Sequence, residues 1–250
     1  AVVATTRASA AELTRLCRET GSAATASCIY NGFDPDDLSG LECGPQVRSR
    51  LRIVYTGTLW NLTSIAPLVR ALQGIAQAAP PCAAELELVV AGRRTPQQDA
   101  ILDGLRGTAI RVERCGYLPH RQSLALAASA DVLLLLLGDQ PGAERVVPAK
   151  LFEYLALGKR ILAVGPEGEA RDLLRDHGQA ASFHPAEIEP LTRWLTTQLD
   201  GARDPHSPPR TTCDAASLPA RLSRYSRSSL TEELAQLLEC CVKQPAGRAP

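Results

Sequence analysis

Short apolar segments alternate with segments of helical periodicity from residue 51 to residue 199. The strand-sized apolar segments span residues 52–57, 85–92, 109–116, 130–138, 160–165 and 180–183. Helical spacing follows most of them, at 62–78, 119–129, 148–158, 169–178 and 185–199. Because strand–helix repeats connect through right-handed crossovers, this pattern predicts an α/β fold with a doubly wound, Rossmann-like parallel sheet. Residues 130–138 are apolar on both faces, which favours a central strand.

Glycine ends four of the predicted strands, at Gly57, Gly92, Gly116 and Gly165. A tight turn explains any one of these glycines taken alone. Sheets of this class bind ligands in the crevice outside the carboxyl ends of their strands. The shared position of the glycines therefore favours a crevice that is lined by backbone.

We predict that the main domain spans residues 25–200 and contains this repeating pattern. Residues 1–24 predict one strand and one helix, the remnant of the end of a preceding domain. The sequence contains no Met, even at position 1, which we interpret as a sign of a fragment or an excised domain. Residues 201–216 are rich in Pro, Ser, Thr and Asp and predict a linker, and residues 217–250 form a C-terminal helix and tail.

The C-terminal helix, predicted at about 218–241, carries an apolar stripe. At helical spacing, a stripe of this kind must pack against another surface. Its members include Leu230, Leu234, Leu237 and Leu238.

Composition excludes several classes of protein. Lys plus Arg and Asp plus Glu number 27 each, and no basic stripe is present, so we expect no nucleic-acid partner. No apolar run approaches the roughly 20 residues that span a bilayer, although a peripheral membrane contact stays open. The eight cysteines show no C-x-x-C pair and no zinc-ligand spacing, and there is no secretory signal. Free thiols in the cytoplasm and no metal site are therefore expected.

Familiar catalytic motifs are absent from the sequence. It contains no dinucleotide fingerprint, no P-loop and no nucleophile elbow. The four histidines show no spacing typical of a triad, and we assign them surface or structural roles. They are His120, His177, His184 and His206.

The segment "VVPAKLFEYLALGKR", residues 146–160, places two charges in an otherwise apolar helix. Pro148 suits the first helical turn, and Lys150 and Glu153 share one face, three residues apart. The helix start and Lys150 could stabilise a diphosphate, while Glu153 could accept hydrogen bonds from a ribose. A solvated Lys–Glu pair explains the spacing equally well. The apolar stripe of this helix comprises Leu151, Phe152, Leu155 and Ala156.

Several stretches, in this order, resemble the C-terminal, donor-nucleotide-binding domain of retaining GT-B glycosyltransferases of family 4 (glycosyl transferases group 1). They are "CIYNGFDPDDL", "RIVYTGTLW…PLVRAL", "LVVAG", "CGYLPHRQSLALAASADVLLLL", "VVPAKLFEYLALGKRILAVGPEGEARDLL" and "LSRYSRSSLTEELAQLLE". The resemblance spans about residues 25 to 240. It implies one half of a GT-B architecture, in which the C-terminal helix crosses back to the N-terminal domain.

The resemblance also implies a set of donor-binding residues. Glu153 would be the second acidic residue of the family's E-x7-E motif and would hold the ribose hydroxyls. Gly57 and Thr58 would approach the phosphates, and the segment after "GDQPG" would face the donor sugar. Residues along the base would be Gly116, Tyr117 and Leu118. The whole expected set is Gly57, Thr58, Arg93, Gly116, Tyr117, Leu118, Pro148, Lys150, Leu151 and Glu153.

The sequence departs from the family pattern at two places. The residue eight positions before Glu153 is Arg145, where the motif has an acid. The acidic residue Glu144 lies one position earlier. The Arg and Lys that usually flank the phosphates are not found in "GTLWNLTSIAP". Arg93, Arg94 or Lys150 could replace them, and we favour Lys150.

The function implied is the transfer of a sugar from a nucleotide diphosphate sugar to an acceptor with net retention, by a bacterial, metal-independent enzyme without a cofactor. The partners are the donor, an acceptor and an N-terminal domain, and no residue is assigned to the catalytic step. Alternatives are a non-catalytic nucleotide-sugar-binding module and a sugar-nucleotide epimerase of the same plan. A pure interaction domain that uses the C-terminal helix ranks last.

Overall fold

The central feature of the computed structural model, which describes residues 1–41, 50–178, 180–203 and 220–243, is a parallel sheet of six strands. Their order is β5-β4-β3-β6-β7-β8, and every pairing is parallel. The doubly wound sheet predicted from the sequence is thereby confirmed. The strands are β3 (Leu51–Thr56), β4 (Leu86–Ala91), β5 (Arg111–Cys115), β6 (Val132–Leu136), β7 (Arg160–Val164) and β8 (Ala180–Phe183).

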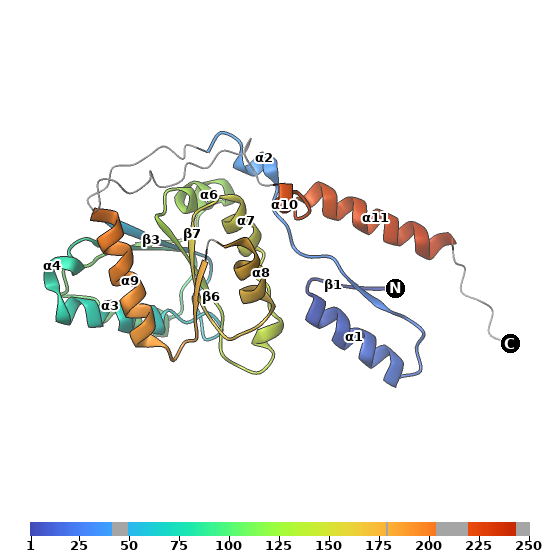
Figure 1. Ribbon diagram of the computed structural model, residues 1–250, viewed down its shortest axis with the longest axis horizontal. Helices are drawn as coiled ribbons and strands as arrows, with labels where there is room; N and C mark the ends of the chain where they lie inside the picture. The colour runs from blue at the N-terminus through green and yellow to red at the C-terminus, as the bar shows by residue number, and fades with distance from the viewer. Residues whose placement is uncertain (42–49, 179, 204–219, 244–250) are drawn as a thin grey trace.

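Helices cover both faces of this sheet, and Figure 1 shows α3 and α9 on one side and α7 and α8 on the other. The short elements α4, α5 and η1 were not expected from the sequence. The helices between the strands are α3 (Ala66–Ala78), α4 (Pro80–Ala83), α5 (Pro96–Asp103), α6 (His120–Ala128), α7 (Lys150–Ala156), α8 (Glu169–His177) and α9 (Ile188–Arg203), with the 3-10 turn η1 at Ala143–Arg145.

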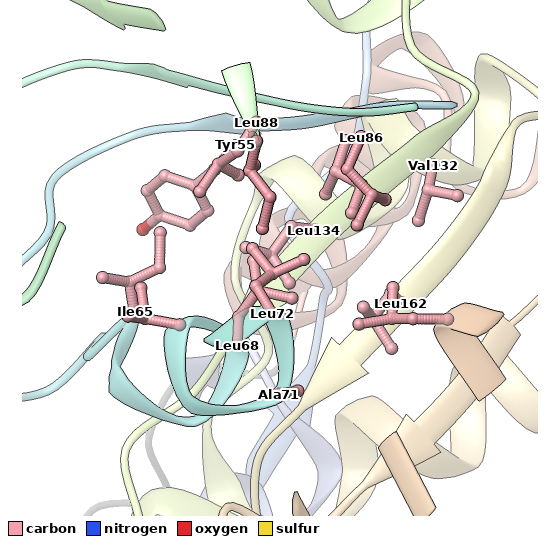
Figure 2. Packing of buried hydrophobic residues seen from close by; sticks show 14 of the residues in the cluster. Tyr55, Ile65, Leu68, Ala71, Leu72, Leu86, Leu88, Val132, Leu134 and Leu162 are labelled. Atoms are coloured by element: carbon pink, nitrogen blue, oxygen red, sulfur yellow. The ribbon is translucent and has the colours of Figure 1, made fainter. Parts of the chain in front are cut away.

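Two apolar cores lie on the two faces of the sheet because successive side chains of a strand point to opposite sides. In β3, Ile53 and Tyr55 pack toward α3 and α9, while Val54 packs toward α6 and α7. Figure 2 shows the first of these cores, with Tyr55 beside Leu88 and above the α3 residues. All five residues of β6 are buried and β6 lies between β3 and β7, which confirms a central strand within the predicted segment 130–138.

The four predicted strand-end glycines directly follow β3, β4, β5 and β7. At Gly57 and Gly92 the φ angles are 133° and 128°, which L side chains rarely adopt. A Cβ atom on Gly92 would lie 2.1 Å from the carbonyl oxygen of Gly57. Glycine at position 92 therefore lets two adjacent chain segments meet at the sheet edge.

The strand order reverses between β3 and β6. The chain runs outward from β3 through β4 to β5 and then returns to place β6 on the other side of β3. In open α/β sheets, ligands bind outside the carboxyl ends of the strands at such a switch point. The carboxyl ends of β3 and β6 are thus the place to look for a site.

The N-terminal residues form a separate small sheet. Strand β1 (Val2–Ala4) leads into α1 (Arg7–Glu19), and β2 (Ala26–Cys28) returns to pair in parallel with β1. The predicted strand and helix are both present. The domain boundary predicted at residue 24 falls between α1 and β2, and the boundary itself stays a prediction.

In the described part of the C-terminal region, residues 220–243, there are two helices, α10 (Ala220–Ser223) and α11 (Arg227–Lys243), where the sequence predicted one. The break arises because this backbone pairs with Phe33, which precedes α2 (Pro35–Leu38). The Phe33 N–H donates to the Tyr225 carbonyl (3.1 Å), and the Arg227 N–H donates to the Phe33 carbonyl (2.9 Å). Residues 201–203 of the predicted linker continue α9, and the rest of that linker lies outside the described residues.

The apolar stripe of α11 packs only at its beginning within the described part of the chain. Leu230 is buried, whereas Leu234 and Leu238 are 38% and 57% exposed. Figure 1 shows why, since α11 extends away from the sheet. Within the described residues the stripe is therefore covered only at its start, and the expectation that the rest of it packs against another surface stays a prediction.

Six of the eight cysteines lie in the described ranges, and no disulfide joins any of these six to another. Cys43 and Cys213 fall outside these ranges. Among the described helices, none combines the length and the apolar character needed to cross a membrane.

Candidate nucleotide site

Helix α7 begins at Lys150, so the expectation that Pro148 lies in its first turn is wrong. Pro148 belongs to the preceding loop, and its carbonyl accepts the Leu151 N–H (3.0 Å). The Phe152 N–H donates in the same way to the Ala149 carbonyl (3.1 Å). Two of the N–H groups expected to be free for a ligand are thus engaged. The main positive group here is the Lys150 side chain.

The ammonium of Lys150 lies at the carboxyl end of β3. Its Nζ donates to the Thr56 carbonyl (2.8 Å) and lies 4.2 Å from the centre of the Tyr55 ring. A Cβ atom on Gly57 would approach Nζ to 2.6 Å. Lys150 therefore reaches the switch point, next to the glycine predicted to approach the phosphates.

Burial lowers the pKa of Lys150 to about 8, and the negative charge of Glu153 opposes this shift. Among the residues that the structure describes, the ammonium has exchanged water for one carbonyl and an aromatic face, and Thr56 takes one of its N–H donors. A desolvated cation of this kind gains from an anion that takes its remaining donors.

Tyr154 fixes α7 against the same strand end. Its buried hydroxyl accepts the Thr56 N–H (3.3 Å) and shares a hydrogen bond with the Thr56 hydroxyl (3.0 Å). Burial raises the pKa of this phenol. Because Thr56 contacts both Tyr154 and Lys150, the position of the ammonium is set by the packing of α7 on β3.

The Glu153 carboxylate lies near His120, and no ion pair joins it to Lys150 in the described part of the chain. A solvated Lys–Glu pair is therefore not what the structure shows. The Glu153 side chain is 19% exposed, and its Oε1 lies 3.8 Å from Nε2 of His120. Burial raises the pKa of Glu153, while the nearby charges of His120 and Arg227 oppose the rise. Among the described residues nothing donates a hydrogen bond to this carboxylate.

His120 is a site neighbour that the sequence analysis assigned only a surface or structural role. It begins α6, and its Nε2 lies 3.1 Å from Oδ2 of Asp37 in α2. Three segments far apart in the sequence thus meet at Glu153, and no local spacing could have indicated this. Of the other histidines, His184 contacts Asp139 (3.1 Å), His177 packs on Tyr225, and His206 lies outside the described residues.

The residues expected along the base are placed at the end of β5. Gly116 follows this strand, its carbonyl accepts the Gly92 N–H (3.0 Å), and Tyr117 is 75% exposed. Leu118 is half-buried. The exposed Tyr117 ring offers a free aromatic face beside the edge of the sheet.

Two further expected residues differ in what they can offer a ligand. Thr58 is exposed, and its carbonyl accepts hydrogen bonds from Tyr55 (2.9 Å) and Thr63 (2.6 Å). Leu151 is fully buried, so its side chain belongs to the core. Its N–H is taken by Pro148 as well.

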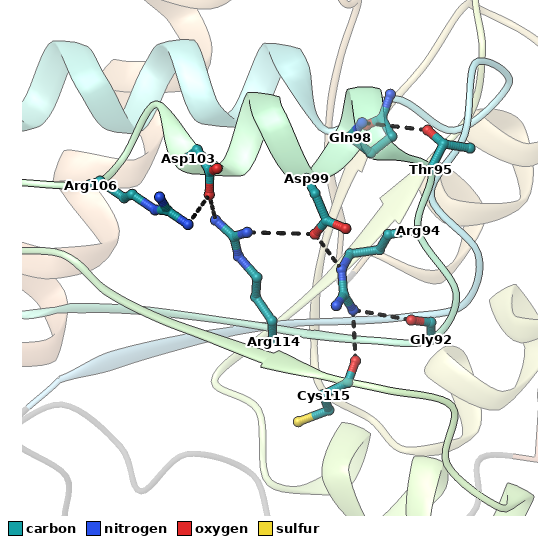
Figure 3. Close-up of polar contacts among 9 residues, drawn as sticks. All are labelled: Gly92, Arg94, Thr95, Gln98, Asp99, Asp103, Arg106, Arg114 and Cys115. Atoms are coloured by element: carbon teal, nitrogen blue, oxygen red, sulfur yellow. Dashed lines mark hydrogen bonds and ion pairs between the residues drawn. The ribbon is translucent and has the colours of Figure 1, made fainter.

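Arg94, one of the candidates for a phosphate contact, is committed to structure. Its guanidinium donates to Asp99 (2.8 Å) and to the carbonyls of Gly92 (3.1 Å) and Cys115 (2.7 Å), as Figure 3 shows. These bonds tie the ends of β4 and β5 together. Arg93 is exposed, and its side chain has no partner among the described residues. Arg93 is therefore the one of this pair that a ligand could reach.

The first position of the E-x7-E motif is occupied by Arg145, with the acid Glu144 beside it. Arg145 and Glu144 are both exposed in η1, with 3.7 Å between Nε and Oε1. The Glu144 carboxylate accepts the Gly142 N–H (2.9 Å), so it stabilises its own turn. Within the described residues, no group of three or more His, Cys, Asp or Glu is arranged to hold a metal ion.

The sequence matches no protein-family model and no curated protein, but solved structures share its fold. A UDP-forming α,α-trehalose-phosphate synthase from Burkholderia vietnamiensis superposes with a TM-score of 0.69 at 12% identity, over 97% of this chain and 60% of its own. The apo form of the lipopolysaccharide outer core galactosyltransferase WaaB superposes with a TM-score of 0.63 at 16% identity, over 95% of this chain and 61% of its own. HepE from Anabaena, in complex with UDP and glucose, superposes with a TM-score of 0.62 at 20% identity, over 95% of this chain and 62% of its own.

These likenesses define the class of the fold. The chain has the Rossmann-like architecture of one half of a GT-B glycosyltransferase, as the resemblance in the sequence implied. It spans about three fifths of the length of these neighbours.

Proposed function

We propose that this chain is the donor-binding half of a retaining, family 4-like glycosyltransferase that transfers a sugar from a nucleotide diphosphate sugar to an acceptor. One observation carries the proposal. Near the switch point, α7 presents a desolvated ammonium at the end of β3 and, three residues on, a largely buried carboxylate that accepts no hydrogen bond from the described residues. The two groups complement the diphosphate and the ribose of one ligand.

Lys150 has the electrostatic role in this proposal. Sugar transfer breaks the bond between the sugar and the diphosphate, so negative charge grows on the leaving phosphate oxygen. A cation that is already in place beside Gly57 stabilises this charge without having to reorganise. Arg93, exposed next to Gly92, adds a second cation at the same edge. No step of the proposal uses a metal ion.

Glu153 has the recognition role. A carboxylate is an acceptor only, and a ribose offers two adjacent hydroxyl donors. Tyr117 and Gly116 supply an aromatic face and open backbone along the base. HepE, whose structure holds UDP and glucose, has a similar fold, which favours a nucleotide as the ligand here.

The acceptor side of the reaction requires more protein than this chain provides. We propose that an N-terminal domain binds the acceptor, since the neighbours are longer by about two fifths of their own length. The chain alone is then expected to bind a nucleotide weakly and to transfer no sugar. Transfer by this chain alone would contradict that division of roles.

Replacing Glu153 by alanine tests the ribose contact. Calorimetric titration with UDP, GDP and ADP should show a loss of about 1.5–3 kcal/mol in binding free energy, the range for hydrogen bonds to a charged group. Glu153→Gln keeps the size but replaces one acceptor oxygen by a donor, so it should lose part of the affinity. The matched control is Glu189→Ala, which removes an exposed carboxylate from α9 and should bind like the wild type. Equal affinity of wild type and Glu153→Ala would refute the contact.

Two alternatives remain to be separated by product analysis of a chain that includes its N-terminal domain. Nucleotide binding without any turnover would favour a non-catalytic binding module, which the exposed Arg145 at the motif position supports. An epimerised sugar in place of a new glycosidic bond would favour an epimerase.

A further inference from the structure

The carboxylate of Glu169 joins two helices, one that follows a strand of the large sheet and one that follows a strand of the small sheet. Glu169 is the first residue of α8, which follows β7 of the large sheet. Its Oε1 accepts the Arg7 N–H (2.8 Å), and its Oε2 accepts the Ala8 N–H (2.9 Å). Arg7 and Ala8 begin α1, which follows β1 of the small sheet. The Tyr30 hydroxyl donates to Oε1 as well.

These contacts supply hydrogen-bond acceptors to the first backbone N–H groups of α1. The first N–H groups of a helix have no partner within it. In α1, the Ser9 N–H donates to the Thr6 hydroxyl (3.1 Å) and the Ala10 N–H to the Thr6 carbonyl (3.0 Å). Glu169 takes the remaining two. Since α8 also begins at this residue, a negative charge lies where the positive ends of two helices meet.

The backbone around Glu169 is shaped to hold it there. Gly168 has a φ of 153°, and a Cβ atom on it would lie 2.3 Å from the carbonyl oxygen of Glu144. Only glycine fits this contact, so the start of α8 is fixed against η1. The turn η1 lies against both α1 and α8.

Tyr30 connects this carboxylate to the candidate nucleotide site. Its ring packs on Phe152 (5.7 Å between centroids) and on Tyr225 (5.8 Å). Phe152 belongs to α7, between Lys150 and Glu153. Burial and the Glu169 hydrogen bond both raise the pKa of the Tyr30 phenol, so it stays a hydrogen-bond donor at neutral pH.

We propose that Glu169 is a positioning residue, a carboxylate latch that holds the β1–α1–β2 unit against the carboxyl edge of the six-stranded sheet. The latch sets the distance between the carboxyl ends of β1 and β7. Its release would free the N-terminal unit, and whatever precedes it, from the edge at which the candidate site lies. The latch does not require that a nucleotide binds.

Amide hydrogen exchange measured by NMR on the whole chain tests the latch. The amides of Arg7 and Ala8 owe their protection to Glu169, whereas those of Ser9 and Ala10 owe theirs to Thr6. Opening of the latch and unfolding of α1 therefore leave different signatures. In Glu169→Gln and Glu169→Ala, we expect the first two amides to exchange roughly 10- to 100-fold faster, the ratio that corresponds to loss of a charge-assisted hydrogen bond. The Ser9 and Ala10 amides should stay protected.

Two further variants sharpen the result. Tyr30→Phe keeps the ring between Phe152 and Tyr225 but removes the hydroxyl, so it should accelerate the same two amides by a smaller factor. Asp172→Asn removes an exposed charge from the first turn of α8 without touching α1, and it should leave all four amides unchanged.

Three results would overturn the latch. The Arg7 and Ala8 amides could exchange in the wild type as fast as in an unfolded peptide. They could also be unaffected in both Glu169 variants. Equal acceleration of all four amides would show that Glu169 stabilises α1 itself rather than its position.

Discussion

Replacing Lys150 by methionine is expected to weaken the binding of nucleoside diphosphates by about 2–5 kcal/mol, the range for removing one partner of a buried charge pair. The reason is that Nζ lies beside Gly57 at the end of β3, where a diphosphate would take its free donors. Calorimetry with UDP, GDP and ADP measures the loss. The control Arg193→Met removes an exposed charge from α9 and should have no effect.

The same residue makes binding depend on pH. Because the pKa of Lys150 is about 8 in the free chain, its positive charge is lost as the pH rises above that value. The affinity for a diphosphate should therefore decline between pH 7 and pH 9.5, by at most about tenfold per pH unit. In Lys150→Met the affinity should be low and flat over this range. A wild-type affinity that stays constant up to pH 9.5 would contradict the assignment.

The stability of the free chain should change with pH in the opposite direction. The pKa of Lys150 is depressed in the folded state from 10.5 to about 8, so the unfolded chain binds more protons between these values. The free energy of unfolding gains a contribution that rises with pH across this window. Comparing urea unfolding of wild type and Lys150→Met from pH 7 to pH 10.5 isolates it. A difference between the two that does not change with pH would refute the desolvated ammonium.

Replacing Gly92 by alanine is expected to lower the free energy of unfolding by about 3 kcal/mol or more. Two effects add at this position, since φ is 128° and the new Cβ would lie 2.1 Å from the carbonyl oxygen of Gly57. Urea unfolding followed by circular dichroism measures the change. The backbone at the edge must shift, so nucleotide affinity should fall with stability.

Substitutions at two other glycines separate the backbone strain from the steric contact. Gly107 has a φ of 79° but open space around it, so Gly107→Ala should cost about 1 kcal/mol from backbone strain alone. Gly201 lies in α9 with neither problem, so Gly201→Ala should stabilise the chain by about 0.5–1 kcal/mol. A Gly92→Ala variant no less stable than Gly107→Ala would show that the contact with Gly57 is easily relieved.

Local sequence patterns were sufficient for most of the fold. Each strand of the large sheet lies within a residue or two of its predicted bounds. For β3, β4, β6 and β7 the reason is that a strand buried on both faces leaves a largely apolar run, whereas β5 and β8 are less buried. Gly57 and Gly92 mark strand ends because the turns that follow them need a positive φ. The break between α10 and α11 was missed because it results from pairing with Phe33, far away in the sequence.

The sequence by itself determined that Lys150 and Glu153 lie on a helix after the most buried strand, since helical periodicity and burial are local properties. Only the tertiary structure decided where each charge points, to the end of β3 in one case and to His120 in the other. It also decided that Arg94 is used internally while Arg93 is free among the described residues, and that Glu169 reaches α1. Such contacts join residues that are distant along the chain, so they depend on how the elements pack and leave no trace in local periodicity.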